Sequence, residues 1–141
     1  MTSALLHRMF PTIERSAQER TMRSVSERYE AEAFGDAEFI LTGPDFDFKI
    51  VRDRSQVFAY VSLLGKGDWH YLQDAVAFIS GISPEEMSQF EKAALLSNAD
   101  FATRALTVHY AELSRLMKDE SRIAGLREFE EQKRAIRRRR R

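Results

Sequence analysis

The stretch that decides the fold is Phe46-Asp47-Phe48-Lys49-Ile50-Val51-Arg52-Asp53-Arg54-Ser55-Gln56-Val57-Phe58-Ala59-Tyr60-Val61-Ser62-Leu63-Leu64. Its first part alternates, with Phe46, Phe48 and Ile50 on one face, which is typical of a half-buried strand. Its second part, 57–64, is apolar on both faces, which favours a strand that is central or covered by helices. Residues 53–56 have turn composition, so the two strands should pair antiparallel.

A third strand is predicted just before this stretch. Residues 39–42 form a short apolar run, and Gly43-Pro44-Asp45 has the chemistry of a turn. Because all connections are short, we expect a three-stranded antiparallel meander that ends near residues 65–68.

Helices are predicted on both sides of the meander. Residues 12–34 read as one helix, because Met22, Val25 and Tyr29 recur at spacings of three and four residues. Further helices are expected over 69–79, from a capping box at 83–86 to about 97, over 100–120, and more weakly from 121. The predicted fold class is therefore α+β: an N-terminal helix, a three-stranded antiparallel meander, then three to four covering helices.

The predicted core combines the inward faces of these elements. It comprises Phe46, Phe48, Ile50, Val57, Val61, Leu72, Val76, Phe90, Leu106, Leu113 and Met117.

Charge is divided unevenly along the 141 residues. The chain has 22 basic and 22 acidic residues, and the last ten contain seven basic and no acidic ones, so residues 1–131 keep 15 basic and 22 acidic side chains, a net charge of −7. We therefore expect one α+β domain over 1–131 and a basic arginine-rich tail over 132–141. Five consecutive arginines repel one another, so the end of the tail is predicted to be frayed.

The sequence carries no complete catalytic, metal or cofactor motif. It has no cysteine, and its three histidines, His7, His70 and His109, lack a metal-ligand spacing. We therefore expect no cofactor and no enzyme activity; an enzyme centred on His70, with Asp68 or Asp74 as partner, is the third alternative. We also expect a cytoplasmic protein without a membrane partner, since no apolar run approaches the length of a membrane span.

An acidic segment suggests a protein partner. Residues 27–53 contain eight acidic and three basic side chains, which would steer a basic protein toward this surface. The predicted partner-binding residues are Glu38, Asp45, Asp47, Asp53, Trp69 and His70.

The basic tail suggests a different ligand, because cationic side chains bind the phosphates of nucleic acids. The residues of this alternative are Lys133, Arg134, Arg137, Arg138, Arg139, Arg140 and Arg141. The tail could also dock on an acidic surface, and apolar side chains over 121–136 could equally serve a homodimer.

One stretch also resembles known proteins. In residues 36–80, an Arg52-Asp53-Arg54 turn joins two strands and Trp69 opens the next helix. This pattern resembles small uncharacterised bacterial cytosolic proteins of the polymorphic-toxin immunity type. The resemblance implies a protein that blocks a toxin by direct binding, so our leading interpretation is a non-enzymatic protein-binding module.

Overall fold

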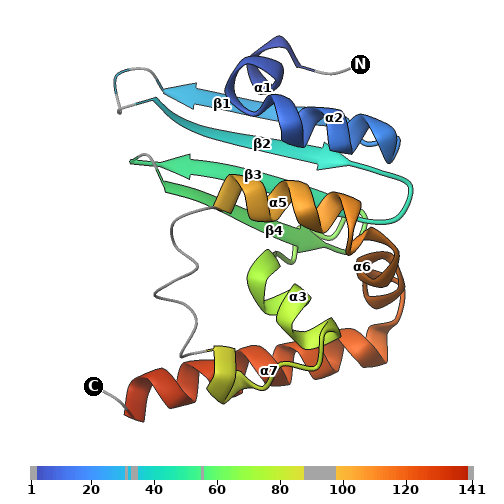
Figure 1. Ribbon diagram of the computed structural model, residues 1–141, viewed down its shortest axis with the longest axis vertical. Helices are drawn as coiled ribbons and strands as arrows, with labels where there is room; N and C mark the ends of the chain where they lie inside the picture. The colour runs from blue at the N-terminus through green and yellow to red at the C-terminus, as the bar shows by residue number, and fades with distance from the viewer. Residues whose placement is uncertain (1–2, 31, 33–34, 55, 88–97, 140–141) are drawn as a thin grey trace.

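The computed structural model describes residues 3–30, 32, 35–54, 56–87 and 98–139, and these form an α+β fold (Figure 1). One sheet contains five strands, each antiparallel to the next and arranged in chain order. The strands are β1 (Arg23–Glu30), β2 (Asp36–Thr42), β3 (Asp47–Asp53), β4 (Gln56–Ser62) and β5 (His70–Tyr71). The helices are α1 (Ala4–Met9), α2 (Pro11–Glu19), α3 (Leu72–Ile79), α5 (Asn98–Thr107), α6 (Tyr110–Met117) and α7 (Glu120–Arg139).

The α+β class is confirmed, but the three-stranded meander was too small. The predicted helix over 12–34 is wrong beyond Glu19, where α2 ends. Thr21 adopts a positive φ of 62°, which is incompatible with a continuing α-helix. The chain then enters β1, which pairs with β2 along its whole length. Val25 and Tyr29 have helical spacing but are 53% and 49% exposed on this strand, so their spacing reflected no buried face.

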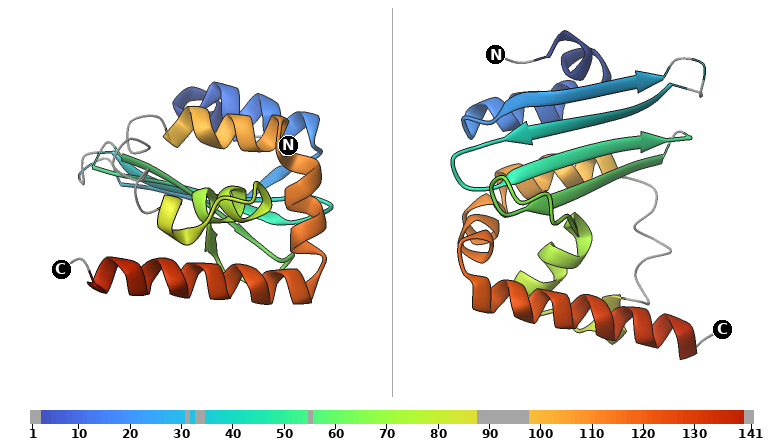
Figure 2. Two further views of the ribbon diagram at one scale, coloured as in Figure 1. Left: turned by 60° about the horizontal axis from the view of Figure 1, so that its bottom comes forward. Right: turned by 180° about the vertical axis from the view of Figure 1, so that it is seen from behind.

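Helices cover one face of the sheet. Figure 2 shows α1, α2 and α5 together on this face, with α7 on the other side. The residues of β2, β3 and β4 that point toward α1, α2 and α5 are buried: Ala37, Phe39, Leu41, Phe48, Ile50, Ala59 and Val61. We call the other side the open face, because its side chains on β2 and β3 and the rings of β4 stay partly exposed.

Most of the predicted core is confirmed. Nine of the predicted side chains are buried: Phe46, Phe48, Ile50, Val61, Leu72, Val76, Leu106, Leu113 and Met117. Val57 is only partly buried at the edge of this cluster, and Phe90 lies outside the described residues.

The predicted helix over 100–120 is two helices. It breaks at Val108 and His109, between α5 and α6. In Figure 2, α6 runs past the edge of the sheet and carries the chain from the α5 side to α7. This break is what places the C-terminal helix beside the open face.

The basic tail is helical as far as the structure describes it. Residues 132–139 continue α7, so the predicted fraying does not apply to them. Lys133 and Ile136 are buried, and Glu131 lies 3.2 Å from Arg134 and 3.0 Å from Arg138. These contacts relieve the repulsion among the basic side chains on which the prediction of fraying rested.

Candidate ligand-binding pocket

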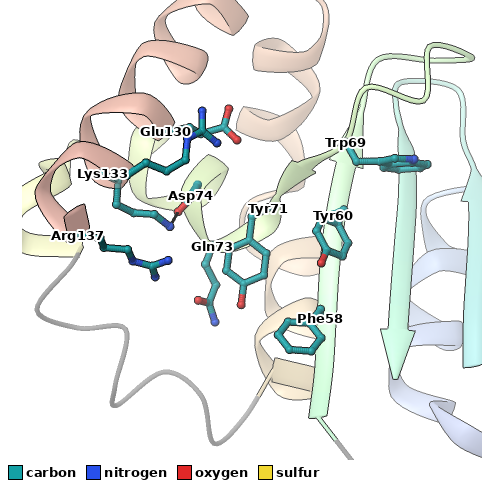
Figure 3. Close-up of a pocket in the computed structure, with 10 residues that line it drawn as sticks. Phe58, Tyr60, Trp69, Tyr71, Gln73, Asp74, Glu130, Lys133 and Arg137 are labelled. Atoms are coloured by element: carbon teal, nitrogen blue, oxygen red, sulfur yellow. Dashed lines mark hydrogen bonds and ion pairs between the residues drawn. The ribbon is translucent and has the colours of Figure 1, made fainter. Parts of the chain in front are cut away.

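A pocket of about 630 Å³ lies between α7 and the β4–β5 end of the open face (Figure 3). Strands β4 and β5 supply its aromatic floor, α3 supplies polar groups, and α7 supplies a basic wall. The lining residues are Phe58, Tyr60, Trp69, Tyr71, Gln73, Asp74, Glu130, Lys133, Arg134 and Arg137.

The floor is aromatic because of the strand alternation in β4. Ala59 faces the core, so Phe58 and Tyr60 must point to the open face. Tyr71 pairs with Tyr60 across β4 and β5, and their ring centroids lie 5.8 Å apart. Phe58 lies 6.5 Å from Tyr71. Burial raises the pKa of Tyr71 to about 12, so its hydroxyl is neutral near pH 7. The floor therefore presents half-buried, uncharged ring surface.

Lys49 and Trp69 extend the floor along the sheet. The Lys49 ammonium lies 4.7 Å from the ring centroid of Tyr60 and 4.8 Å from that of Trp69. Both distances are within the range of cation–π attraction. The position of Lys49 is set by register, because it pairs with Tyr60 across β3 and β4.

A buried ion pair holds the basic wall in place. Lys133 Nζ lies 2.5 Å from Asp74 Oδ1, and each side chain is only 6% exposed. Burial raises the pKa of the Asp74 carboxyl, and the hydrogen bond from Lys133 opposes that rise. Arg137 reaches from the next turn of α7 toward Gln73 in Figure 3. The pair therefore fixes the distance between α7 and α3, and the arginines remain at the rim.

His70 also fastens α7 to the sheet. Its buried ring places Nδ1 2.8 Å from Glu130 Oε1 and Nε2 3.7 Å from Asp68 Oδ2. Asp68 in turn lies 2.6 Å from Arg127 of α7. Of the two predicted partners, Asp68 is near and Asp74 binds Lys133 instead; sequence reasoning missed Glu130, sixty residues away. A ring this deeply enclosed has a structural role in joining β5 to α7.

Two of the predicted acidic residues serve the fold. Asp45 accepts a hydrogen bond from the Tyr110 hydroxyl at 2.7 Å and pairs with Lys118 at 2.5 Å. Asp47 is 8% exposed and accepts a hydrogen bond from the main-chain nitrogen of Gly65 at 2.8 Å. Their carboxylates close turns next to the sheet, so little of either is left to attract a basic partner.

The remaining acidic residues do not join them. Glu38 lies on the open face of β2 and pairs with Arg28 at 3.0 Å. Asp53 is exposed at the far end of β3. Of the predicted partner-binding set, only Trp69 lines the pocket.

The predicted nucleic-acid set does reach the pocket. Lys133, Arg134 and Arg137 line it, and Arg138 and Arg139 are exposed on the same helix end. Arg140 and Arg141 lie outside the described residues. The floor residues Phe58, Tyr60 and Tyr71 were missed, although the aromatic second face of 57–64 signalled them.

Further searches leave the pocket to be interpreted from its own geometry. Within the described ranges, no three acidic or histidine side chains form a group that could hold a metal ion. None of the helices described is both long and apolar enough to cross a membrane. Comparisons with protein-family models, curated proteins and solved structures give no match to this chain.

Proposed function

We propose that this chain is a non-catalytic binding protein for single-stranded nucleic acid. The observation that carries the proposal is the pairing, in one pocket, of aromatic faces on a sheet with arginines at the rim of a neighbouring helix. Bases stack on aromatic rings, and arginines contact the phosphates between them.

The ring floor favours a single strand over a duplex. Phe58, Tyr60 and Tyr71 are partly exposed on the open face, where an unpaired base can lie against them. In a duplex the base faces are already stacked on one another. Groups that read a duplex must enter a groove, and the floor of this pocket is recessed between the sheet and α7.

Charge supports the same orientation of the ligand. Arg137, Arg138 and Arg139 follow one another on the last turn of α7 and are exposed. A ligand whose bases lie on the floor would bring its phosphates to this end of the helix. Binding should therefore weaken steeply as salt rises.

Fluorescence anisotropy with labelled single-stranded oligonucleotides tests the proposal. Replacing Arg137, Arg138 and Arg139 by Gln should weaken binding and flatten its salt dependence by about one unit per lost phosphate contact. Arg104→Gln is the matched control, because Arg104 is exposed on α5 at the covered face. The proposal fails if the full-length protein binds no single strand, or binds a duplex of the same sequence equally well.

A protein partner is the second candidate. Trp, Tyr and Arg dominate the energetics of protein interfaces, and Trp69, Tyr60, Tyr71 and Arg137 gather at this pocket. In this case the chain would act as an immunity-type protein that blocks its target by direct contact. A pulldown with nuclease treatment separates the two candidates: a protein captured after nuclease, and lost with Trp69→Ala, would favour the protein partner.

A further inference from the structure

We infer that Lys49 is a second phosphate-binding point, so that the ligand spans at least two nucleotides, with one phosphate on Lys49 and another at the arginines of α7. This inference rests on the proposed function and adds the length and path of the ligand. Its basis is a continuous row of side chains that runs from β3 to α7.

The row alternates charge and ring surface. Lys49 Nζ lies 4.7 Å from the Tyr60 ring, the Tyr60 and Tyr71 rings are 5.8 Å apart, and Lys133 Nζ lies 5.7 Å from the Tyr71 ring. Strand register fixes this order, because Lys49 pairs with Tyr60 and Tyr60 pairs with Tyr71. Two rings therefore lie between a cation on the sheet and the basic wall of α7.

Lys49 differs from the other cations nearby in its partners. Lys133 is paired with Asp74, and Arg134 with Glu131. In the part of the chain that the structure describes, Lys49 contacts two aromatic rings and forms no ion pair with a carboxylate. Its charge is therefore available to an anion without first breaking a salt bridge.

The two rings also hold the Lys49 side chain in place. A lysine in solution loses side-chain entropy when it binds a phosphate. Contact with both Tyr60 and Trp69 restricts Lys49 before any ligand arrives. The side chain is thus preorganised on the same face as the floor on which the bases would stack.

The distance between the two cationic ends sets the minimum ligand. A single stranded chain advances roughly 3.4 Å per stacked nucleotide. The 5.8 Å between the centroids of Tyr60 and Tyr71 already exceeds this step, and the cations lie beyond the rings on either side. A mononucleotide on Tyr71 can reach Arg137 but cannot also reach Lys49.

A length series tests this inference. Binding of a mononucleotide, a dinucleotide and an octanucleotide is measured for the full chain and for Lys49→Met, which keeps the aliphatic stem and removes the charge. The variant should bind the octanucleotide several-fold more weakly, with a salt slope lower by about one, and should bind the mononucleotide as the parent does. Lys49→Arg should restore both affinity and slope, since it keeps the charge and the ring contacts.

Lys66→Met is the matched control, because Lys66 is exposed in the loop before β5 and should contribute nothing. Should Lys49→Met fail to fold, as judged by Trp69 emission and thermal unfolding, Lys49→Gln takes its place. The inference is overturned if the parent binds but loss of the Lys49 charge leaves the salt slope unchanged, or weakens the mononucleotide equally. Absence of binding by the parent at every length would instead overturn the proposed function itself.

Discussion

Arg20 donates a hydrogen bond from Nε to the main-chain oxygen of Leu106, 3.0 Å away. Its Nη2 donates a second bond to the oxygen of Thr107 at 2.9 Å, and its guanidinium lies 4.6 Å from the ring centroid of Tyr110. Those two carbonyls belong to the last turn of α5, where a helix has no partners of its own for them. One side chain after α2 therefore stabilises the end of α5 and the start of α6.

Arg20→Ala should lower the free energy of unfolding by about 2 kcal/mol, because two hydrogen bonds to a charged donor are lost. Urea unfolding followed by circular dichroism measures the change. Arg15→Ala, an exposed position on α2, is the control and should change stability by less than about 0.5 kcal/mol. Equal effects of the two substitutions would show that Arg20 does not stabilise the α5–α6 break.

Lys133→Met should destabilise the protein by about 3 kcal/mol, since it leaves the Asp74 carboxyl buried without its cation. Adding Asp74→Asn to Lys133→Met should recover part of this loss, because no buried charge then remains. A double-mutant cycle in urea measures both effects. If the double variant is less stable than Lys133→Met alone, the uncompensated charge is not the cause of the loss.

Asp45→Asn should change the acid limb of the stability curve. Hydrogen bonds from Lys118 and Tyr110 lower the pKa of Asp45 below its usual value of 3.8. A depressed pKa in the folded state stabilises the protein above pH 3.8, and this stabilisation is lost as the pH falls through the folded value. Wild type should therefore lose more stability than Asp45→Asn between pH 6 and pH 2.

Unfolding in urea at a series of pH values makes this comparison. Asp53→Asn is the control, since Asp53 is exposed at the end of β3. Parallel curves for wild type and Asp45→Asn would show that the contacts of Asp45 add no stability.

Tyr71→Ala should weaken binding of a single-stranded oligonucleotide by roughly 1–3 kcal/mol, the cost of losing one stacking surface. Trp69 is the only tryptophan in the chain and lines the pocket, so its emission should report the bound ligand without a label. Tyr29→Ala is the matched control, because that ring is exposed on β1, away from the pocket. Equal losses for Tyr71→Ala and Tyr29→Ala would place the ligand elsewhere.

The alternation rule predicted the centre of the sheet well. Phe48, Ile50 and Val61 are buried on one face, as their period of two requires. The capping box was also predicted, and the main-chain nitrogen of Glu86 donates to Ser83 Oγ at 3.1 Å. Both patterns work because their residues interact with near neighbours in the chain.

The same rules failed where distant contacts decide the structure. The mostly polar segment of β1 pairs with β2 despite its helical spacing, and α5 ends where Arg20 reaches its carbonyls. In the pocket, the partner of His70 is Glu130, which no local pattern marks. The aromatic floor was visible as the second face of β4, but only the position of α7 shows that this face borders a recess.

The attachment of α7 has a dynamic consequence. It borders the pocket without adding a strand to the sheet, and side-chain contacts hold its outer half there, the Lys133–Asp74 and His70–Glu130 pairs among them. Such an element can detach locally without unfolding the sheet. Amide hydrogens in the last turns of α7 should then exchange with solvent sooner than those of β3. A ligand that bridges both walls would slow that exchange, because it binds only the docked form.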